Sequence, residues 1–386
     1  MKEKNQLFLL VIGMLLYILD LTSDVWLAIR YHKNDESGWF FATLSVLIIA
    51  CIVTNMAVCL HVFKDTIEGP YKCLWMFCTC PILFRFVEEF AYWKQANVDR
   101  SPCGQKCQIP RCKECEKHLE KRQRSLKSTY SLTWLHLMQT LTGSAPQFCL
   151  QMYIMLNQWH FPSLTVISTL ISFISLAWSI ISLELARESK NKNELFNFGS
   201  KLIFLSWQIF GLISRLTAIV IVAYILRYYV FFVLGFHWFL VTMAIAIHRR
   251  EEFSGEGTYA CIFMLITLLF CVFPLLIFAT EPLLSFYNNR RWYTFVAFVV
   301  FAIENTIMVA LSFVVSKLDV FTLSWSHENL FWFVVAACVL GGLALETVFF
   351  LGYYRFCCSR KEIDAASNEP VAVEDIALEN DGFNNC

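Results

Sequence analysis

The sequence predicts an all-α polytopic membrane protein with about eight transmembrane helices and two re-entrant half-membrane segments, arranged as two parallel repeats. Hydrophobic residues make up 57% of the 386 residues and charged residues only 16%, whereas about a quarter of the residues in a soluble domain are charged. The mean hydropathy is +0.54. Ten apolar segments approach or exceed the roughly 20 residues that cross a bilayer. The positions of Lys and Arg between these segments orient the chain.

The ten apolar segments alternate with polar stretches along the whole chain. The first follows Met1-Lys2-Glu3-Lys4, is longer than the apolar part of a signal peptide, and contains Asp20 and Asp24. We therefore predict that it is a retained first helix. The segments cover residues 7–29, 39–63, 71–93, 130–157, 164–186, 202–226, 230–247, 259–280, 292–316 and 330–355.

The third and the eighth of these segments are predicted to enter the membrane and return on the same side. If all ten segments crossed, the most basic loop, 94–129 with ten Lys and Arg, would lie outside, against the tendency of basic loops to stay in the cytoplasm. With both segments re-entrant, eight spans remain, both termini are cytoplasmic, and 25 of the 31 Lys and Arg lie in cytoplasmic stretches. The residues that mark these two segments are Pro81, Arg85 and Glu88 in the third and Pro274 in the eighth.

The chain is predicted to divide into two membrane repeats and a tail. Residues 1–190 form the first repeat, which includes the Cys-rich cytoplasmic loop 94–129, and residues 191–356 form the second. Each repeat holds five segments, and the third of each has the central proline. The tail, 357–386, is acidic and has no apolar periodicity, so we expect a disordered cytoplasmic segment.

The fourth segment is broken in its middle by Gly143-Ser144-Ala145-Pro146-Gln147. Backbone groups freed by such a break find no water in hydrocarbon, so the break must be buried in protein or line a polar cavity. We interpret it as a pointer to a functional path. The alternative is a proline kink whose backbone groups are bonded by Ser144 or by neighbouring helices.

Nine ionisable residues lie inside the apolar segments, and each costs about 2.5–3.5 kcal/mol at the centre of an inserted helix. We predict that several line a path for lipid headgroups. Two alternatives remain open: buried ion pairs, with Arg215 bound to an acid, or an ion-coupled transporter that uses the spare carboxylates. Asp20 and Asp24 share a helix face and should repel each other unless an Arg or a headgroup cation lies between them. The nine are Asp20, Asp24, Arg85, Glu88, Glu89, Glu184, Arg215, Glu304 and Glu346.

Four cysteines in loop 94–129 form a candidate zinc site: Cys103, Cys107, Cys112 and Cys115. Closely spaced thiolates chelate zinc, and four of them would close its coordination shell, so the metal would be structural. Free or lipidated thiols, or disulfides, are the alternatives. Cys357 and Cys358 follow the last apolar segment and are palmitoylation candidates. We expect no other cofactor.

The sequence contains no motif of an enzyme. G-x-S-x-G, H-E-x-x-H and P-loop sequences are absent, and the eight His are scattered. The basic residues of loop 94–129 are typical of a solvated or anionic-lipid-facing surface rather than of a nucleic-acid site. We therefore expect neither enzymatic activity nor nucleic-acid binding.

Three stretches resemble the XK-related membrane proteins. They are Asp20-Leu21-Thr22-Ser23-Asp24-Val25-Trp26, the broken element with Leu150-Gln151-Met152-Tyr153-Ile154, and Ile303-Glu304-Asn305. Several members of that family are ATP-independent phospholipid scramblases of the plasma membrane, which expose phosphatidylserine in apoptosis after a caspase cuts a cytoplasmic tail. The resemblance also implies eight spans and two half-inserted segments in two related halves.

The resemblance extends to the predicted path but departs from the scrambling members at two positions. Those members usually carry two glutamates at the positions where this chain has Gln139 and Gly143. In this respect the chain looks more like the founding XK protein. The alternative function is therefore a non-scrambling membrane adaptor for an accessory membrane protein or a lipid-transfer protein. The predicted path comprises Asp20, Asp24, Gln139, Gln147, Gln151, Glu184, Arg215, Glu304 and Glu346.

The tail contains two candidate caspase sites. Asp364 precedes Ala365 and Asp381 precedes Gly382, and caspases cut after Asp before a small residue. We favour Asp364, because some family members carry a Glu-Ile-Asp cut site there. The alternative is an acidic solvating tail that contains Asp by composition alone.

Overall fold

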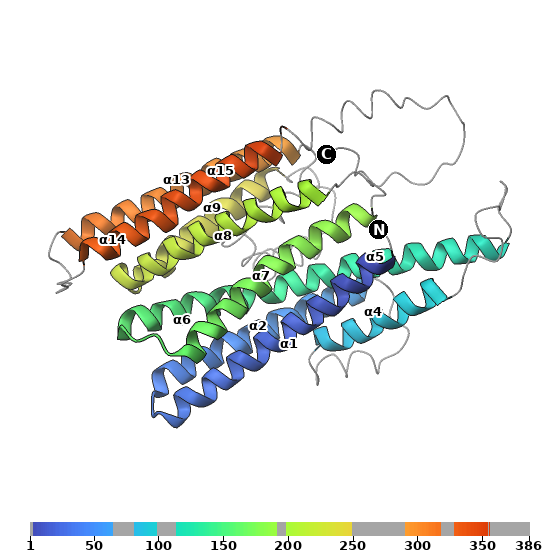
Figure 1. The fold of residues 1–386 in the computed structure, drawn as a ribbon, viewed down its shortest axis with the longest axis horizontal. Helices are drawn as coiled ribbons and strands as arrows, with labels where there is room; N and C mark the ends of the chain where they lie inside the picture. The colour runs from blue at the N-terminus through green and yellow to red at the C-terminus, as the bar shows by residue number, and fades with distance from the viewer. Residues whose placement is uncertain are drawn as a thin grey trace. The chain divides into compact units, whose positions relative to one another are not determined.

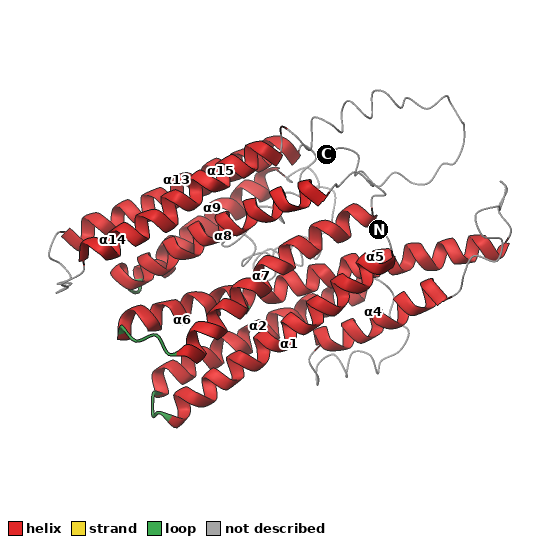
Figure 2. Cartoon of the chain, in the orientation of Figure 1, coloured by secondary structure: helices red, strands yellow, loops and turns green. Residues whose placement is uncertain are grey.

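The computed structural model describes residues 3–64, 81–98, 113–190, 198–248, 290–317, 328–353 and 355, and within these ranges the chain is helical apart from short turns (Figure 2). Six helices are long and apolar enough to cross a membrane. This confirms an all-α polytopic membrane protein. The eight-span count and the two re-entrant segments stay predictions, and the segment around Pro274 lies outside the described residues. The six candidate spans are Gln6–Lys33, Ser37–Ala57, Ser163–Arg187, Gly199–Leu226, Phe298–Lys317 and Phe331–Gly352.

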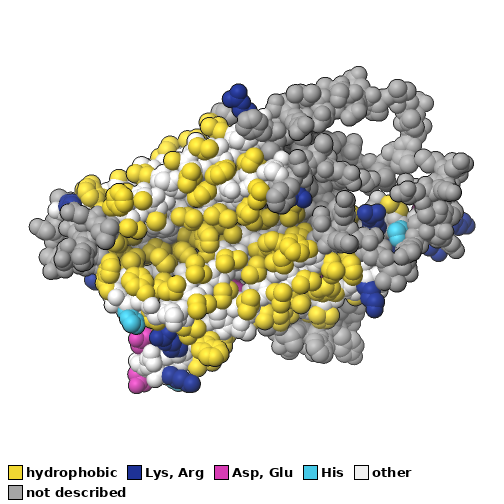
Figure 3. All heavy atoms as spheres, viewed as in Figure 1, with side chains coloured by type: hydrophobic (Ala, Val, Ile, Leu, Met, Phe, Trp, Pro, Cys, Tyr) yellow, Lys and Arg dark blue, Asp and Glu magenta, His cyan; other side chains and the backbone are white. Residues whose placement is uncertain are grey.

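The outer surface of the described helices is apolar. Figure 3 shows hydrophobic side chains over much of the visible face, with charged side chains mainly at the helix ends. Trp26, Phe41 and Val87 are each more than half exposed. Large apolar side chains that face outward in such numbers would be a liability in water, but they suit a surface covered by lipid tails.

The chain divides into two compact units, Met1–Glu194 and Leu195–Cys386. The first unit contains α1 (Glu3–Lys33), α2 (Ser37–Lys64), α4 (Pro81–Val98), α5 (Lys113–Thr142), α6 (Ser144–Gln158) and α7 (Ser163–Lys190) (Figure 1). Its α1 contacts α2, α4 and α7. A core of Leu10, Tyr17, Ile82, Phe86 and Leu132 joins α1, α4 and α5.

The second unit is built around α8 (Phe198–Leu226), which contacts each of the other described elements of that unit. Phe204 and Trp207 of α8 form a core with Phe350 and Tyr353. The last span is interrupted by a π-helical turn, where one extra residue loosens the hydrogen-bond ladder. The other elements are α9 (Tyr229–His248), α13 (Arg290–Lys317), α14 (Glu328–Ala336), the π turn η4 (Ala337–Gly341) and α15 (Gly342–Gly352).

The structure corrects the prediction that residues 94–129 form a loop. The α4 helix continues to Val98, and α5 begins at Lys113, so the second half of the stretch is helical. The reason is its content of Glu, Lys and Arg without Gly or Pro, since long charged side chains favour helix. The structure also places Pro81 at the first residue of α4. Proline is favoured there because its missing N–H would have no partner.

Candidate functional site

The break in the fourth segment is a kink that keeps its backbone hydrogen bonds. Gly143 separates α5 from α6 with φ of −107° and ψ of −72°. Its N–H donates to the Gln139 carbonyl at 2.8 Å, and the Gln147 N–H donates to the Gly143 carbonyl at 2.9 Å. Pro146 lies in the first turn of α6, where N–H groups have no partner within their own helix. Backbone bonding therefore continues across the kink.

Glycine at position 143 allows α2 to approach the kink closely. A β-carbon there would lie 3.1 Å from the Gln139 carbonyl oxygen and 3.2 Å from the Ala50 β-carbon. Both distances are tighter than ordinary van der Waals contact. The kink is therefore packed against protein and is not open to lipid.

The kink presents Ser144 and Gln151 of α6 to the two aspartates of α1. The Ser144 hydroxyl donates to Asp20 Oδ2 at 2.5 Å, and Gln151 Nε2 donates to Asp24 Oδ1 at 3.2 Å. Because these aspartates are four residues apart on one helix face, each meets a different turn of α6. The kinked segment and the first helix are thus joined at two levels.

Hydroxyl groups of α7 complete this network. Ser172 donates to Asp20 Oδ1 at 2.7 Å, and Ser168 donates to Asp24 Oδ1 at 3.1 Å. Thr169 donates to Gln151 Oε1 at 2.7 Å. The residues of the network are at most 4% exposed. We call this set the aspartate network; it consists of Asp20, Asp24, Ser144, Gln151, Ser168, Thr169 and Ser172.

No Lys or Arg of the described helices binds either aspartate. We expected the two aspartates to repel each other unless an Arg or a headgroup cation lay between them, and in the described part of the first unit their partners are neutral hydroxyl and amide donors. Serine suits the donation of hydrogen bonds to the aspartates, because each serine hydroxyl supplies one donor and its small side chain lets α1, α6 and α7 approach closely.

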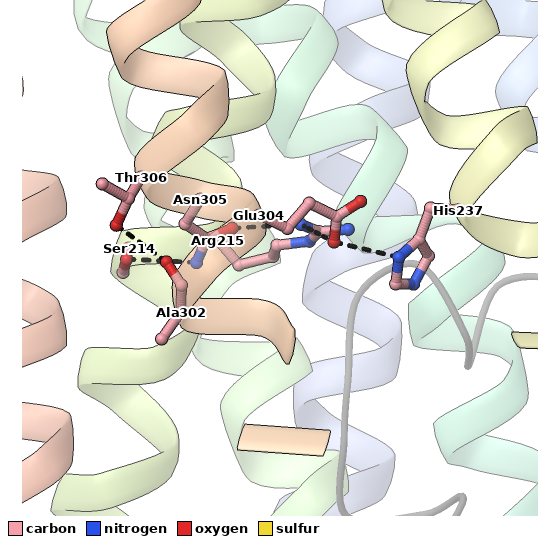
Figure 4. A network of polar contacts seen from close by, with 7 residues as sticks. All are labelled: Ser214, Arg215, His237, Ala302, Glu304, Asn305 and Thr306. Carbon is pink, nitrogen blue, oxygen red and sulfur yellow. Dashed lines mark hydrogen bonds and ion pairs between the residues drawn. The ribbon is translucent and has the colours of Figure 1, made fainter. Parts of the chain in front are cut away.

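The second unit contains a different network, centred on Arg215 of α8 (Figure 4). Arg215 Nη1 lies 2.8 Å from Glu304 Oε2 and 3.0 Å from Asn305 Oδ1. His237 Nδ1 lies 2.9 Å from the same Glu304 oxygen. The guanidinium also lies over the Phe301 ring, 4.6 Å from its centroid, in cation–π geometry. The contact between Arg215 and Glu304 matches the alternative in which Arg215 is bound to an acid, and the side chain of this acid is 19% exposed.

This arginine network continues to the π turn of the last span. Asn305 Nδ2 donates to the Ser214 hydroxyl at 3.3 Å, and that hydroxyl donates to the Val339 carbonyl at 3.2 Å. A β-carbon on Gly342 would lie 3.2 Å from the Ser214 β-carbon. The π turn weakens helical hydrogen bonding, and Ser214 supplies an external donor to one of its carbonyls.

Glu346 of α15 fits against a glycine of α8. A β-carbon on Gly211 would lie 2.8 Å from Glu346 Oε1, so a larger residue there would require the end of the Glu346 side chain to shift. The Trp207 side chain, one turn earlier on α8, donates a hydrogen bond to Glu346. Glu346 is 9% exposed. Among the described residues, the partner of Glu346 is Trp207, and no cationic side chain binds its carboxylate.

The remaining acids of the predicted path and of the third segment lie in the first unit. Glu184 pairs with Arg187 within α7. Arg85 pairs with Glu88 at 2.5 Å within α4. Glu89 faces α5, where Ser128 and Thr129 donate to it, and Gln6 of α1 in turn donates to Thr129 at 2.7 Å.

Several sequence-based predictions fall on residues outside the described ranges. Of the four candidate zinc ligands only Cys115 is described, and it lies buried in α5. The zinc site, palmitoylation and the caspase sites stay predictions. The residues outside are Cys103, Cys107, Cys112, Cys357, Cys358, Asp364 and Asp381.

Sequence reasoning missed the hydroxyl partners of the aspartates. The signal that could have revealed them is a row of serines at intervals of three or four residues along the apolar helix α7. All of these serines are at most 2% exposed. In a membrane helix such a row marks a close helix contact. It consists of Ser168, Ser172, Ser175, Ser179 and Ser182. The sequence also contained no signal that His237 contacts Glu304, since the eight His are scattered along the chain.

Comparison with known proteins identifies the family. The model of the XK-related protein family matches residues 8–359. XK-related protein 8 of Gasterosteus aculeatus is 22% identical over 281 residues, which cover 64% of this chain and 62% of the relative. XK-related protein 8 of Tetraodon nigroviridis is 21% identical over 278 residues, with the same coverage. The match therefore spans less than two thirds of either relative's length. Because the family model covers residues 8–359 of the 386, this protein belongs to the XK-related family.

Proposed function

We propose that this protein moves phospholipids between the leaflets of the plasma membrane without ATP, and so exposes phosphatidylserine. Membership of the XK-related family, which includes scramblases, supports the proposal. The observation that carries it furthest is the presence of ionisable networks within candidate spans of both units. Such groups are expensive in a membrane and generally serve function.

Glu304 is the member of the arginine network best placed to meet a headgroup. Its side chain is 19% exposed, whereas that of Arg215 is 2% exposed. A headgroup with an ammonium and a phosphate group can be bound by a carboxylate and a guanidinium together. In the proposed mechanism Glu304 engages the ammonium group first, and the released Arg215 engages the phosphate, while the acyl chains stay in lipid.

The alternative is a membrane adaptor that moves no lipid itself and binds an accessory membrane protein or a lipid-transfer protein. It is favoured by Gln139 and Gly143, which leave the kink without the two carboxylates usual in scrambling members. The Gln139 amide nitrogen lies 3.4 Å from where a Gly143 β-carbon would be, so neutral groups fill this position. An ion-coupled transporter is a third candidate, and the aspartate network favours it.

Reconstitution separates the first two candidates. Purified full-length protein, and the chain ended after residue 364, would be placed in liposomes with a trace of fluorescent phosphatidylserine, and dithionite would quench the accessible label. A scramblase brings inner-leaflet label to the surface, so quenching proceeds beyond the outer-leaflet fraction. Glu304→Gln should slow this phase. If neither protein moves label while a known scramblase does so in the same vesicles, the adaptor function replaces the proposal.

A further inference from the structure

We propose that the face of α6 turned toward α1 forms a binding site for a small dehydrated monovalent cation, Na⁺, held by Asp20, Asp24 and Gln147. Asp20 and Asp24 are each 2% exposed, and Gln147 is 0% exposed. The proposal goes beyond lipid movement and stands whether or not the protein is a scramblase.

Gln147 provides the first observation. It lies three residues after Ser144 and four before Gln151, so the three side chains share one face of α6. Ser144 binds Asp20 and Gln151 binds Asp24, so Gln147 lies on the face of α6 that carries both partners of the carboxylates. Among the described residues, neither Nε2 nor Oε1 of Gln147 has a hydrogen-bond partner. A buried amide without partners is costly, and a cation would use its carbonyl oxygen.

Charge provides the second observation. Two carboxylates one helical turn apart repel each other in a low dielectric unless a positive charge or a proton intervenes. Around both carboxylates the described helices supply neutral donors and no basic side chain. Oxygen atoms of carboxylates, amides and hydroxyls are the ligands that hard cations take.

The geometry favours a monovalent ion over the alternatives. Ca²⁺ takes six to eight oxygens, whereas the side chains of Asp20, Asp24 and Gln147 have five oxygens between them. A lipid ammonium group would bring its phosphate and glycerol into a region that is at most 2% exposed at both aspartates and at Gln147. A bare ion needs no such space.

A cavity lies near the turn between α1 and α2, at the end of α1 that follows the two aspartates. Its volume is about 260 Å³, several times the roughly 30 Å³ that one water occupies in the liquid. Glu36, Gln158 and Thr165 line it, together with Arg30 and His160. The Thr165 carbonyl accepts the Thr169 hydroxyl at 2.7 Å. Thr165, which lines the cavity, therefore lies one helical turn before Thr169 of the aspartate network.

Thermal unfolding of purified full-length protein in detergent tests the proposal. NaCl would replace choline chloride at constant ionic strength, with tryptophan fluorescence as the readout. Bound Na⁺ stabilises the folded state by mass action, so the Tm should rise and saturate. Asp24→Asn and Gln147→Leu should each weaken the apparent Na⁺ affinity at least tenfold. Thr22→Val is the matched control, because the Thr22 hydroxyl is exposed and bonds only to its own helix.

Four outcomes would overturn the proposal. They are no Na⁺-dependent shift in the unmutated protein, an equal shift in Gln147→Leu, stabilisation by Ca²⁺ alone, and stabilisation that follows pH and ignores Na⁺. The last outcome would assign a shared proton to the aspartates. If Asp24→Asn does not fold, Gln147→Leu decides, because it keeps both carboxylates. The measurement involves no lipid transfer, so the vesicle experiment can fail or succeed independently of it.

Discussion

At the residue scale, the buried acids differ in the partners that hold them. Glu304 has Arg215 and His237, Asp20 has two serines, and Glu346 has Trp207. A buried ion pair adds little net stability compared with apolar packing, but removal of one partner leaves an uncompensated charge. Each acid is therefore expected to respond to mutation according to its partner.

Glu304→Gln tests the arginine network. Arg215 would keep Asn305 and the Phe301 ring but lose its carboxylate, and we expect a loss of about 1–3 kcal/mol. Partial exposure of Glu304 keeps the effect below that of a fully buried pair. The Tm of the purified protein measures it, with exposed Glu120→Gln as control. Equal Tm values in the two variants would contradict the prediction.

Gly211→Ala tests the close approach of Glu346 to α8. The added β-carbon would lie 2.8 Å from Glu346 Oε1, so the Glu346 carboxylate must shift, and we expect a loss of stability no larger than the roughly 1–3 kcal/mol of overpacking. Gly235→Ala is the matched control, because nothing lies within 4 Å of its β-carbon position. Adding Glu346→Ala to Gly211→Ala should remove most of the overpacking, so the double variant should lose less than the sum of the two single changes.

At the element scale, the kink between α5 and α6 depends on Gly143 rather than on Pro146. We expect Pro146→Ala to change the free energy of unfolding by less than about 1 kcal/mol, because the N–H that a proline lacks in the first turn would have no partner within the helix. Gly143→Val should cost more, since its side chain would press on Ala50 and the Gln139 carbonyl. Thermal unfolding of both variants measures the difference, and the reverse order would show that the proline sets the kink.

The docking of α4 on α5 also depends on one acid. Glu89 is 1% exposed and accepts hydroxyl bonds from α5, so Glu89→Ala leaves those donors buried and should cost about 1–3 kcal/mol. Faster amide exchange in residues 81–98 would report the loosened helix. The neighbouring Glu88→Ala is the control, because Glu88 bonds to Arg85 and Tyr92 of its own helix. Equal exchange in both variants would refute this role.

At the scale of the whole molecule, we expect the tail to control activity. A chain ended after residue 364 should expose phosphatidylserine without a death signal, as measured by annexin V in cells that lack other scramblases. Asp364→Ala with Asp381→Ala should block exposure during apoptosis. Asp375→Ala is the control, because bulky Ile376 follows it. Normal exposure in the double variant would rule out the caspase switch.

The sequence predicted the class and most of the helices, because composition and segment length are enough to identify membrane spans. It left open, as an alternative to the headgroup path, that Arg215 pairs with an acid, since an unpaired guanidinium in a span is costly. It did not predict the α7 serines, because a hydroxyl at one position carries little signal until the neighbouring helix is known. The π turn was missed for a related reason: the stretch Ala337–Gly341 is as apolar as the helix around it.

The distance along the chain between Arg215 and Glu304 has a consequence for synthesis. The two residues are 89 positions apart, so at about 5–20 residues per second the carboxylate follows the guanidinium out of the ribosome after roughly 4–18 s. During that interval α8 carries a cation without its main partner, and this charge reduces the free energy gained on insertion of the helix by about 2.5–3.5 kcal/mol. We therefore expect α8 to remain beside the insertion machinery until α13 arrives, which makes the second unit the slow step of biogenesis.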